Sequence, residues 1–471
     1  MQIFCNMIPF LGETDLSTGL LIVFALCLFA VVAFEFVNGF HDTANAVATV
    51  IYTKALKPAL AIPWSGLWNF LGVFAGGIAV AMGILKLVPL DTLMALPVSV
   101  GACLVLSVLL AAIIWNLGTW YFGIPCSSSH TLIGSLIGAG LGFTWYYGGS
   151  VNWHKAEEIG LSLILSPLIG FGLAVLLMLF LKHVIRYKAL FHIPQGEDDR
   201  PPVFVRGILI LTCTLVSFFH GSNDGQKGVG LFMLILIAFL PARFAINHAV
   251  PDAMVIKNLD QMETLLQSIA VNNTSQATLF TQLNGDIEQV KVHLLDKSVT
   301  DKAGTFKFRK EVENLIKSIK GLTDNKQISI SAEHRMALNR KLGGLTKLTD
   351  FAPIWVILTI SVALGLGTMI GWKRIVVTIG EKIGNEHLSY AQGASSEIVA
   401  ASTIGISTVL GLPVSTTHVL SSGIAGSMVA SGGKSNLNKG TLKNIGLAWI
   451  LTLPVSIGLA LLLFVFFHLF I

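Results

Sequence analysis

The chain has 471 residues, of which 53% are hydrophobic and 12% are charged, with a net charge of +5 and a mean hydropathy of +0.74. A soluble domain carries about 25% charged residues, so this composition excludes an ordinary soluble protein. The net charge is small for this length, and we expect no nucleic-acid partner.

Apolar runs long enough, or nearly long enough, to cross about 30 Å of hydrocarbon recur along the whole chain. They occupy residues 19–37, 59–88, 94–122, 124–147, 159–182, 203–220, 228–247, 351–372, 391–410, 412–431 and 444–471. Because a backbone in lipid must satisfy its own hydrogen bonds, these runs predict an all-α polytopic protein embedded in a lipid bilayer. They do not decide how many segments cross the bilayer fully.

Two segments between the apolar runs have a different character. The link at 183–206 is basic, with Lys188, Arg200 and Arg206, which favours the cytoplasmic side of the membrane. The segment 248–350 holds 26 of the chain's 57 charged residues. Its apolar residues recur at helical spacing, as in Leu279, Leu283 and Ile287, so we predict a small soluble helical bundle.

The chain contains an internal repeat whose copies differ by the charged insert. Asp42 corresponds to Asp224 at an offset of 182, and His130 corresponds to His418 at an offset of 288. The difference of 106 is close to the 103 residues of the insert. We therefore predict a first membrane repeat at 1–182, the basic linker at 183–206, a second repeat at 207–247 and 351–471, and the insert at 248–350.

The first duplicated motif is a polar cluster inside apolar sequence. It reads NGFHDTANA at residues 38–46 and returns as HGSNDGQKG at residues 220–228. A charged side chain at membrane depth costs at least about 2.5 kcal/mol and is functional by default. We therefore expect Asp42 and Asp224 to serve the function of the protein.

The second duplicated motif combines proline, hydroxyls and histidine. It reads PCSSSH at residues 125–130 and PVSTTH at residues 413–418, and small residues follow both copies. Proline suits a first helical turn, so Pro125 and Pro413 predict helix starts within the membrane. Together with the glycines of both motifs, they predict broken or re-entrant helices around a cavity. Half-helix N-termini and neutral hydroxyls would suit an oxyanion.

Other classes of function fit these patterns less well. Ser129, His130 and Asp42 could build an intramembrane hydrolase, but no GxSxG elbow is present and a nucleophile need not be duplicated. The five cysteines show no CxxC pair and no metal-ligand spacing, so neither a cofactor nor a resident metal is expected. A receptor or channel with the insert as its readout domain is a further alternative. Duplication favours a transporter over an enzyme.

Four stretches of the chain resemble the PiT family of inorganic phosphate transporters. They cover residues 39–49, 115–134, 220–230 and 412–422. The resemblance implies a phosphate symporter with two inverted repeats, working by alternating access in the bacterial inner membrane. His41 and Lys227 each stand where the family signature has an asparagine. In this the chain resembles the bacterial low-affinity Pit transporters. That resemblance implies proton coupling, and phosphate carried together with a divalent cation such as magnesium.

The motifs and the resemblance together predict the residues of the site. Substrate-binding residues are expected to be Asn38, Asp42, Asn45, Ser127, Ser128, Ser129, Thr131, Asn223, Asp224, Ser415, Thr416 and Thr417. The coupling ion is expected at His41, Asp42, Asp224 and Lys227. Four further candidates have structural alternatives: His130, His418, Glu35 and Gln226. Glu397 is left outside the site, since no charged residue matches it in the first half.

Several alternatives remain open from the sequence. The substrate could be sulfate or a related oxyanion, because a tetrahedral dianion satisfies the same donors. The coupling ion could be sodium. The sequence also leaves open a homo-oligomer, and a regulatory partner for the insert at 248–350.

Overall fold

The computed structural model describes residues 16–185, 187–196, 199–271, 277–295, 302–325, 328 and 330–471, which form two compact units. The larger unit contains residues 19–90, 102–235 and 353–471. The smaller unit contains the described residues of 16–18, 91–101 and 236–352.

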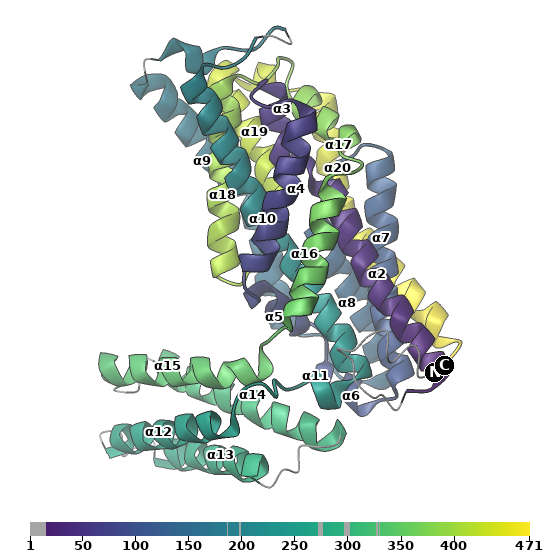
Figure 1. Ribbon diagram of the computed structural model, residues 1–471, viewed down its shortest axis with the longest axis vertical. Helices are drawn as coiled ribbons and strands as arrows, with labels where there is room; N and C mark the ends of the chain where they lie inside the picture. The colour runs from purple at the N-terminus through teal and green to yellow at the C-terminus, as the bar shows by residue number, and fades with distance from the viewer. Residues whose placement is uncertain are drawn as a thin grey trace. The chain divides into compact units, whose positions relative to one another are not determined.

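The smaller unit is built mainly from the charged insert, which forms a helical bundle (Figure 1). Its helices are α12 (Asp252–Val271), α13 (Ala277–Leu295), α14 (Lys302–Asp324) and α15 (Ala332–Thr349). Their apolar faces meet in one core that includes Leu283, Ile287 and Leu315. Lys291 crosses between α12 and α13, where carboxylates of both helices lie within 2.9 Å of its Nζ atom. Apolar residues inside and ion pairs outside are the pattern of a water-soluble bundle.

The larger unit holds the apolar helices. In chain order they are α2 (Thr18–Asp42), α3 (Ala44–Tyr52), α4 (Pro58–Ala75), α5 (Ala79–Leu85), α7 (Val98–Tyr121), α8 (Ser128–Tyr147), α9 (Trp153–Val184), α10 (Val203–Phe239), α16 (Ile354–Thr368), α17 (Lys373–Val377), α18 (Tyr390–Val409), α19 (Thr416–Gly432) and α20 (Lys439–His468). A few residues at the ends of α2, α7 and α10 are counted in the smaller unit, which also contains the short helix α6 (Leu90–Ala95) except for its first residue. The π-helical turn Thr378–Lys382 (η3) follows α17. Among the described residues, five helical segments are long and apolar enough to cross a membrane, or up to seven if two bent pairs each count as one. The predicted all-α membrane fold is confirmed.

Helices from the two halves of the sequence pack against each other in a crossed arrangement. In Figure 1, α8 lies beside α20, and α19 lies beside α9. Glycines allow the close approach, because a Cβ atom on Gly138 would overlap the carbonyl of Ile457, and one on Gly426 would press on the carbonyl of Phe171. Each short helix of one half is therefore clamped by a long helix of the other half.

The structure corrects the prediction of a helix interruption at the second polar motif. Residues 220–228 lie inside the uninterrupted helix α10. Its glycines serve close packing, because Gly221 lies against the backbone of Asn69 and Gly228 against the side chain of Glu35. At the first motif the interruption is a single residue, Thr43, whose hydroxyl donates to the carbonyls of Gly39 and Thr368.

The predicted helix starts at Pro125 and Pro413 are also wrong. Helix α8 begins at Ser128 and α19 at Thr416, so each proline lies two residues before the N-cap. The N-caps are Ser127 and Ser415, since each hydroxyl accepts a hydrogen bond from a backbone N–H of the first turn. A hydroxyl satisfies one orphan donor of a helix end, which proline cannot do.

We expect Gly138→Val to destabilise the protein, because the added methyl groups would force α8 away from α20. Overpacking of this kind costs about 1–3 kcal/mol. Thermal unfolding of the purified protein should show a lower midpoint than wild type. Gly446→Val on α20 is the control, since nothing lies within 4 Å of a Cβ at that position. Equal midpoints for the two variants would contradict the crossed packing.

Candidate functional site

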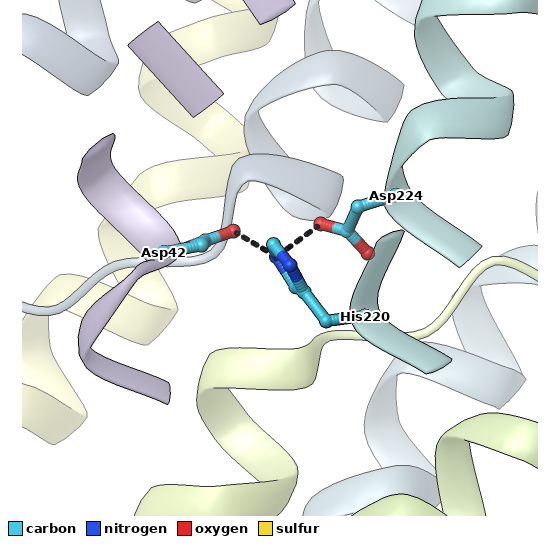
Figure 2. Close-up of side chains that lie close together, drawn as sticks. All are labelled: Asp42, His220 and Asp224. Atoms are coloured by element: carbon cyan, nitrogen blue, oxygen red, sulfur yellow. Dashed lines mark ion pairs between the residues drawn. The ribbon is translucent and has the colours of Figure 1, made fainter. Parts of the chain in front are cut away.

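Two carboxylates and an imidazole from the duplicated polar motifs meet inside the larger unit. Figure 2 shows the ring of His220 between Asp42 and Asp224. The Nε2 atom of His220 lies 3.8 Å from Oδ2 of Asp42 and 3.7 Å from Oδ2 of Asp224. All three side chains are buried, and their ligand atoms lie within 4.8 Å of one another, close enough to hold a metal ion. The structure thus joins the two halves of the repeat at their carboxylates.

The hydrogen bonds around His220 determine which of its nitrogens carries a proton. Its Nδ1 atom lies 2.7 Å from Oδ1 of Asn69, which can only accept. The amide of Asn69 is oriented by its own donation to the hydroxyl of Thr368, at 3.2 Å, because that hydroxyl already donates to the carbonyl of Leu364. Nδ1 of His220 therefore carries a hydrogen.

A neutral His220 with its proton on Nδ1 has a lone pair on Nε2. That lone pair faces the oxygens of Asp42 and Asp224, and Nε2 has no hydrogen-bond partner. Lone pairs facing each other in a buried site repel, so the arrangement becomes favourable when a proton is added to Nε2 or to a carboxylate. The three ligand atoms lie close enough together for one cation to contact all of them.

Two further side chains lie beside the carboxylates, outside the cluster. Lys227, one turn after Asp224, places its Nζ atom 2.7 Å from Oδ2 of Asp224 and also donates to the hydroxyl of Ser129. His41 places Nδ1 3.1 Å from Oδ1 of Asp42. Lys227 is fully buried, where a charge needs a partner. Asp224 is the one described carboxylate within ion-pair distance of its Nζ atom.

Hydroxyls from both serine- and threonine-rich motifs point at the same carboxylate. Ser128 donates to Oδ2 of Asp42 at 2.7 Å, and Thr417 donates to Oδ1 at 2.9 Å. Asn45 donates to Thr417 at 2.9 Å and so holds that hydroxyl in place. These side chains belong to the first turns of α8 and α19 and to the start of α3. The helix N-termini of both halves therefore converge on the site with their positive ends.

Other predicted residues have mainly structural contacts. Ser127 and Ser415 are engaged as N-caps. Asn223 donates to the hydroxyl of Thr408 and to the carbonyl of Leu412, and its oxygen accepts from the N–H of Val414. These contacts tie the loop before α19 to α10, so Asn223 positions the hydroxyl motif.

Gln226 and Thr131 are likewise bonded to backbone. Gln226 accepts from the N–H of Val80 at 2.8 Å and donates to the carbonyl of Gly76, which fixes the bend between α4 and α5. Thr131 donates to the carbonyl of Ser127 at 3.0 Å. Neither side chain has a hydrogen bond to the carboxylates of the cluster among the described contacts.

Asn38 and Glu35 form a buried pair at the rear of the site. Asn38 donates to Oε2 of Glu35 at 3.3 Å, and Glu35 lies against Gly228, the residue after Lys227. Glu397 lies elsewhere and accepts hydrogen bonds from Thr49 and Thr212.

His130 and His418 face each other across the two halves. Their ring centroids are 4.5 Å apart, and His418 stacks on Trp449 at 3.9 Å. Each ring has one buried nitrogen without a hydrogen-bond partner.

Sequence reasoning missed His220 and Asn69 as parts of the site. The signal for His220 was present, because it precedes Asp224 by four residues and therefore shares its helix face. Asn69 lies in an apolar run without a motif around it, and only the fold brings it to His220.

The chain is similar to known proteins over almost its full length. A model of a phosphate transporter family matches residues 38–460. The low-affinity inorganic phosphate transporter PitA of Escherichia coli (strain K12) is 39% identical over 492 residues, with 96% of this chain and 98% of that protein covered. A probable low-affinity inorganic phosphate transporter of Bacillus subtilis (strain 168) is 30% identical, with 93% and 95% covered.

One solved structure also has the same fold. It is titled the sodium-dependent phosphate transporter and matches with a TM-score of 0.63 and 19% identity. The match covers 96% of this chain and all of that chain.

We expect Lys227→Met to lower the free energy of unfolding by about 3–5 kcal/mol, because it leaves the charge of Asp224 buried and unpaired. The double variant Lys227→Met/Asp224→Asn should recover most of that stability. Thermal unfolding of the purified variants measures both effects, with Lys434→Met on the exposed surface as the control. A double variant no more stable than Lys227→Met would contradict the pairing.

Proposed function

Because the chain belongs to the phosphate transporter family, and is thus a phosphate transporter and not an enzyme, we propose that it imports phosphate together with protons by alternating access. The resemblance inferred from the four motifs is confirmed by the family match. The bacterial relatives support placement in the inner membrane of a bacterial cell. Proton coupling, a metal-phosphate substrate and inverted repeats are further parts of the proposal.

The observation that carries proton coupling is the orientation of His220. Its Nδ1 atom donates to Asn69, so Nε2 is the nitrogen that faces the two carboxylates, and in a neutral ring it presents a lone pair to them. One proton shared among Asp42, His220 and Asp224 removes the repulsion. These three side chains could therefore hold the proton before phosphate binds.

Lys227 supports a mechanism that does not require sodium. Its Nζ atom lies 2.7 Å from Oδ2 of Asp224 and donates to the hydroxyl of Ser129. A sodium ion bound there would compete with an ammonium that is already bonded to the same oxygen. The charge that sodium would bring is supplied by the chain itself.

Phosphate and the carboxylate of Asp42 compete for the same donors. Ser128 and Thr417 donate to Asp42 in this structure. Protonation of Asp42 weakens both hydrogen bonds, because a neutral carboxyl is a poorer acceptor than a carboxylate. The hydroxyls then become available to a phosphate at the ends of α8 and α19. Proton binding thereby favours phosphate binding, which is the requirement for symport.

A divalent cation that travels with phosphate would have ligands in the same cluster. Asp42, Asp224 and His220 offer three atoms within 4.8 Å of one another. Two carboxylate oxygens suit magnesium and manganese, and the imidazole suits the transition metals. A metal ion there would neutralise the carboxylates in place of the proton and bridge to the phosphate oxygens.

The crossed packing supports alternating access between two related halves. Each N-capped helix, α8 or α19, is held by the long helix of the other half. Ser129 of α8 donates to the carbonyl of Val414 just before α19, so the two ends meet directly. Protonation and substrate binding change the charge at this meeting point and allow the halves to rock.

Sulfate is the second candidate substrate, because it has the same tetrahedral oxygens. Phosphate carries a proton that it can donate to a carboxylate, whereas sulfate does not, so Asp42 and Asp224 favour phosphate. For the insert at 248–350 we propose a regulatory or partner-docking role, which rests on its separate core and charged surface.

We expect the purified protein in vesicles to accumulate radiolabelled phosphate when a proton gradient is imposed without sodium, and magnesium to increase the rate. Excess sulfate should compete weakly. Asp224→Asn should abolish accumulation, since Lys227 would lose its partner and the cluster one acid. Glu158→Gln, an exposed residue paired only with Lys155 among its described ion pairs, is the control. Accumulation that needed sodium and ignored the pH gradient would overturn the coupling proposal.

We expect Asp42→Asn to uncouple phosphate binding from pH. In the wild type, one coupled proton should strengthen binding by up to about tenfold for each unit of falling pH. The amide cannot titrate, so the variant should bind phosphate with a flatter pH dependence, measured by equilibrium dialysis. Because ionisation of phosphate itself affects both proteins equally, the difference between them reports the carboxyl. Identical pH profiles would rule out Asp42 as the coupling acid.

A further inference from the structure

A basic and aromatic pocket of about 580 Å³ lies at the end of α7, apart from the carboxylate cluster. It is formed by the end of α7, the residues after it, and the segment from the end of α16 to η3. Its aromatic and basic lining includes Trp120, Tyr121, Phe122, Lys373, Arg374 and Lys382.

The position of this pocket along the chain places it at a membrane surface. Helix α7 is one of the segments able to cross a membrane, and it ends at Tyr121. Tyr121 is 60% exposed and Phe122 is 74% exposed. Aromatic rings at the end of a span are typical of the level of the lipid headgroups.

The pocket contains an excess of positive charge. The guanidinium of Arg374 lies 5.1 Å from the ring centroids of both Trp120 and Tyr121. Its Nη1 atom donates to the carbonyl of Tyr121 at 2.6 Å, which fixes the side chain in the wall. Among the described residues, no carboxylate lies within ion-pair distance of Lys373, Arg374 or Lys382. The charge of the pocket is therefore left for an anion.

We propose that this pocket binds the phosphate-bearing headgroup of an anionic phospholipid. Lys373 and Lys382 attract the phosphate, while Trp120 and the exposed rings of Tyr121 and Phe122 contact the glycerol and the upper acyl chains. A free phosphate would gain little from these rings. The hydroxyl of Thr378 in the pocket is already engaged, since it donates to the carbonyl of Gly123 at 2.8 Å.

A bound headgroup would brace the part of α7 that supports the candidate site. Trp120 packs edge-on against Phe40 with centroids 5.1 Å apart and donates to the carbonyl of Gly371. The hydroxyl oxygen of the preceding residue, Thr119, lies 3.3 Å from Nε2 of His41. The lipid would thus hold the end of α7 against α17 beside His41.

Native mass spectrometry of the full chain in detergent tests the proposal without any transport assay. Phosphatidylglycerol should bind more tightly than phosphatidylcholine of the same acyl chains. Lys373→Gln/Lys382→Gln should weaken phosphatidylglycerol binding by about fivefold per lysine, or about 25-fold together. Lys434→Gln/Lys439→Gln, at exposed positions outside the pocket, is the matched control and should bind as the wild type does.

Three outcomes would overturn the proposal. Equal binding of the two lipids to the wild type would show that the headgroup charge is not recognised. An unchanged affinity in Lys373→Gln/Lys382→Gln would place the lipid elsewhere. Displacement of phosphatidylglycerol by millimolar inorganic phosphate would identify a soluble-anion site instead. Loss of transport without loss of lipid binding would bear on the proposed function only.

Discussion

Two carboxylates with no access to water need compensating charge and hydrogen bonds, and the larger unit is organised by that requirement. An unpaired charge in a protein interior costs several kcal/mol, so the carboxylates need partners. Asp42 accepts hydrogen bonds from α8 and α19, whereas Asp224 is paired with Lys227 of its own helix, α10, and accepts a hydrogen bond from α8. Helices that must all reach one point cannot be displaced independently.

The same requirement fits the proposed binding of both a proton and an oxyanion at this site. Its donors are neutral hydroxyls and helix ends, which stabilise negative charge without adding a fixed positive charge. Lys227 and His41 lie beside the two carboxylates and can balance their charge, so an added anion would need an added cation. In the proposed mechanism, phosphate therefore enters together with a proton or a metal ion.

Much of this could be predicted from the sequence because the chain is duplicated. The pairing of Asp42 with Asp224, and of residues 125–130 with 413–418, identified the residues that the fold brings together. Hydropathy and charge distinguished the insert from the apolar helices, because helices surrounded by lipid need apolar surfaces and a bundle surrounded by water needs a charged one.

The errors have a common physical cause. A glycine in an apolar run either breaks a helix or admits a neighbour, and the local sequence is the same in both cases. Gly221 and Gly228 admit neighbours, so α10 continues through the motif. Asn69 is invisible to motif reasoning for a related reason, since its role is defined by the residue it meets across the fold. Tertiary contacts decide such cases.

The crossed packing of α8 on α20 and of α19 on α9 affects the order of events during synthesis. Helix α8 ends at Tyr147 but its partner α20 begins only at Lys439. Since a ribosome adds about 5–20 residues per second, tens of seconds pass between the synthesis of α8 and the synthesis of its partner helix α20. During that time the first half cannot complete its packing, and its polar motif lacks the hydroxyl of Thr417. The nascent first half therefore leaves the glycine face of α8 without its partner helix until the last helix is inserted.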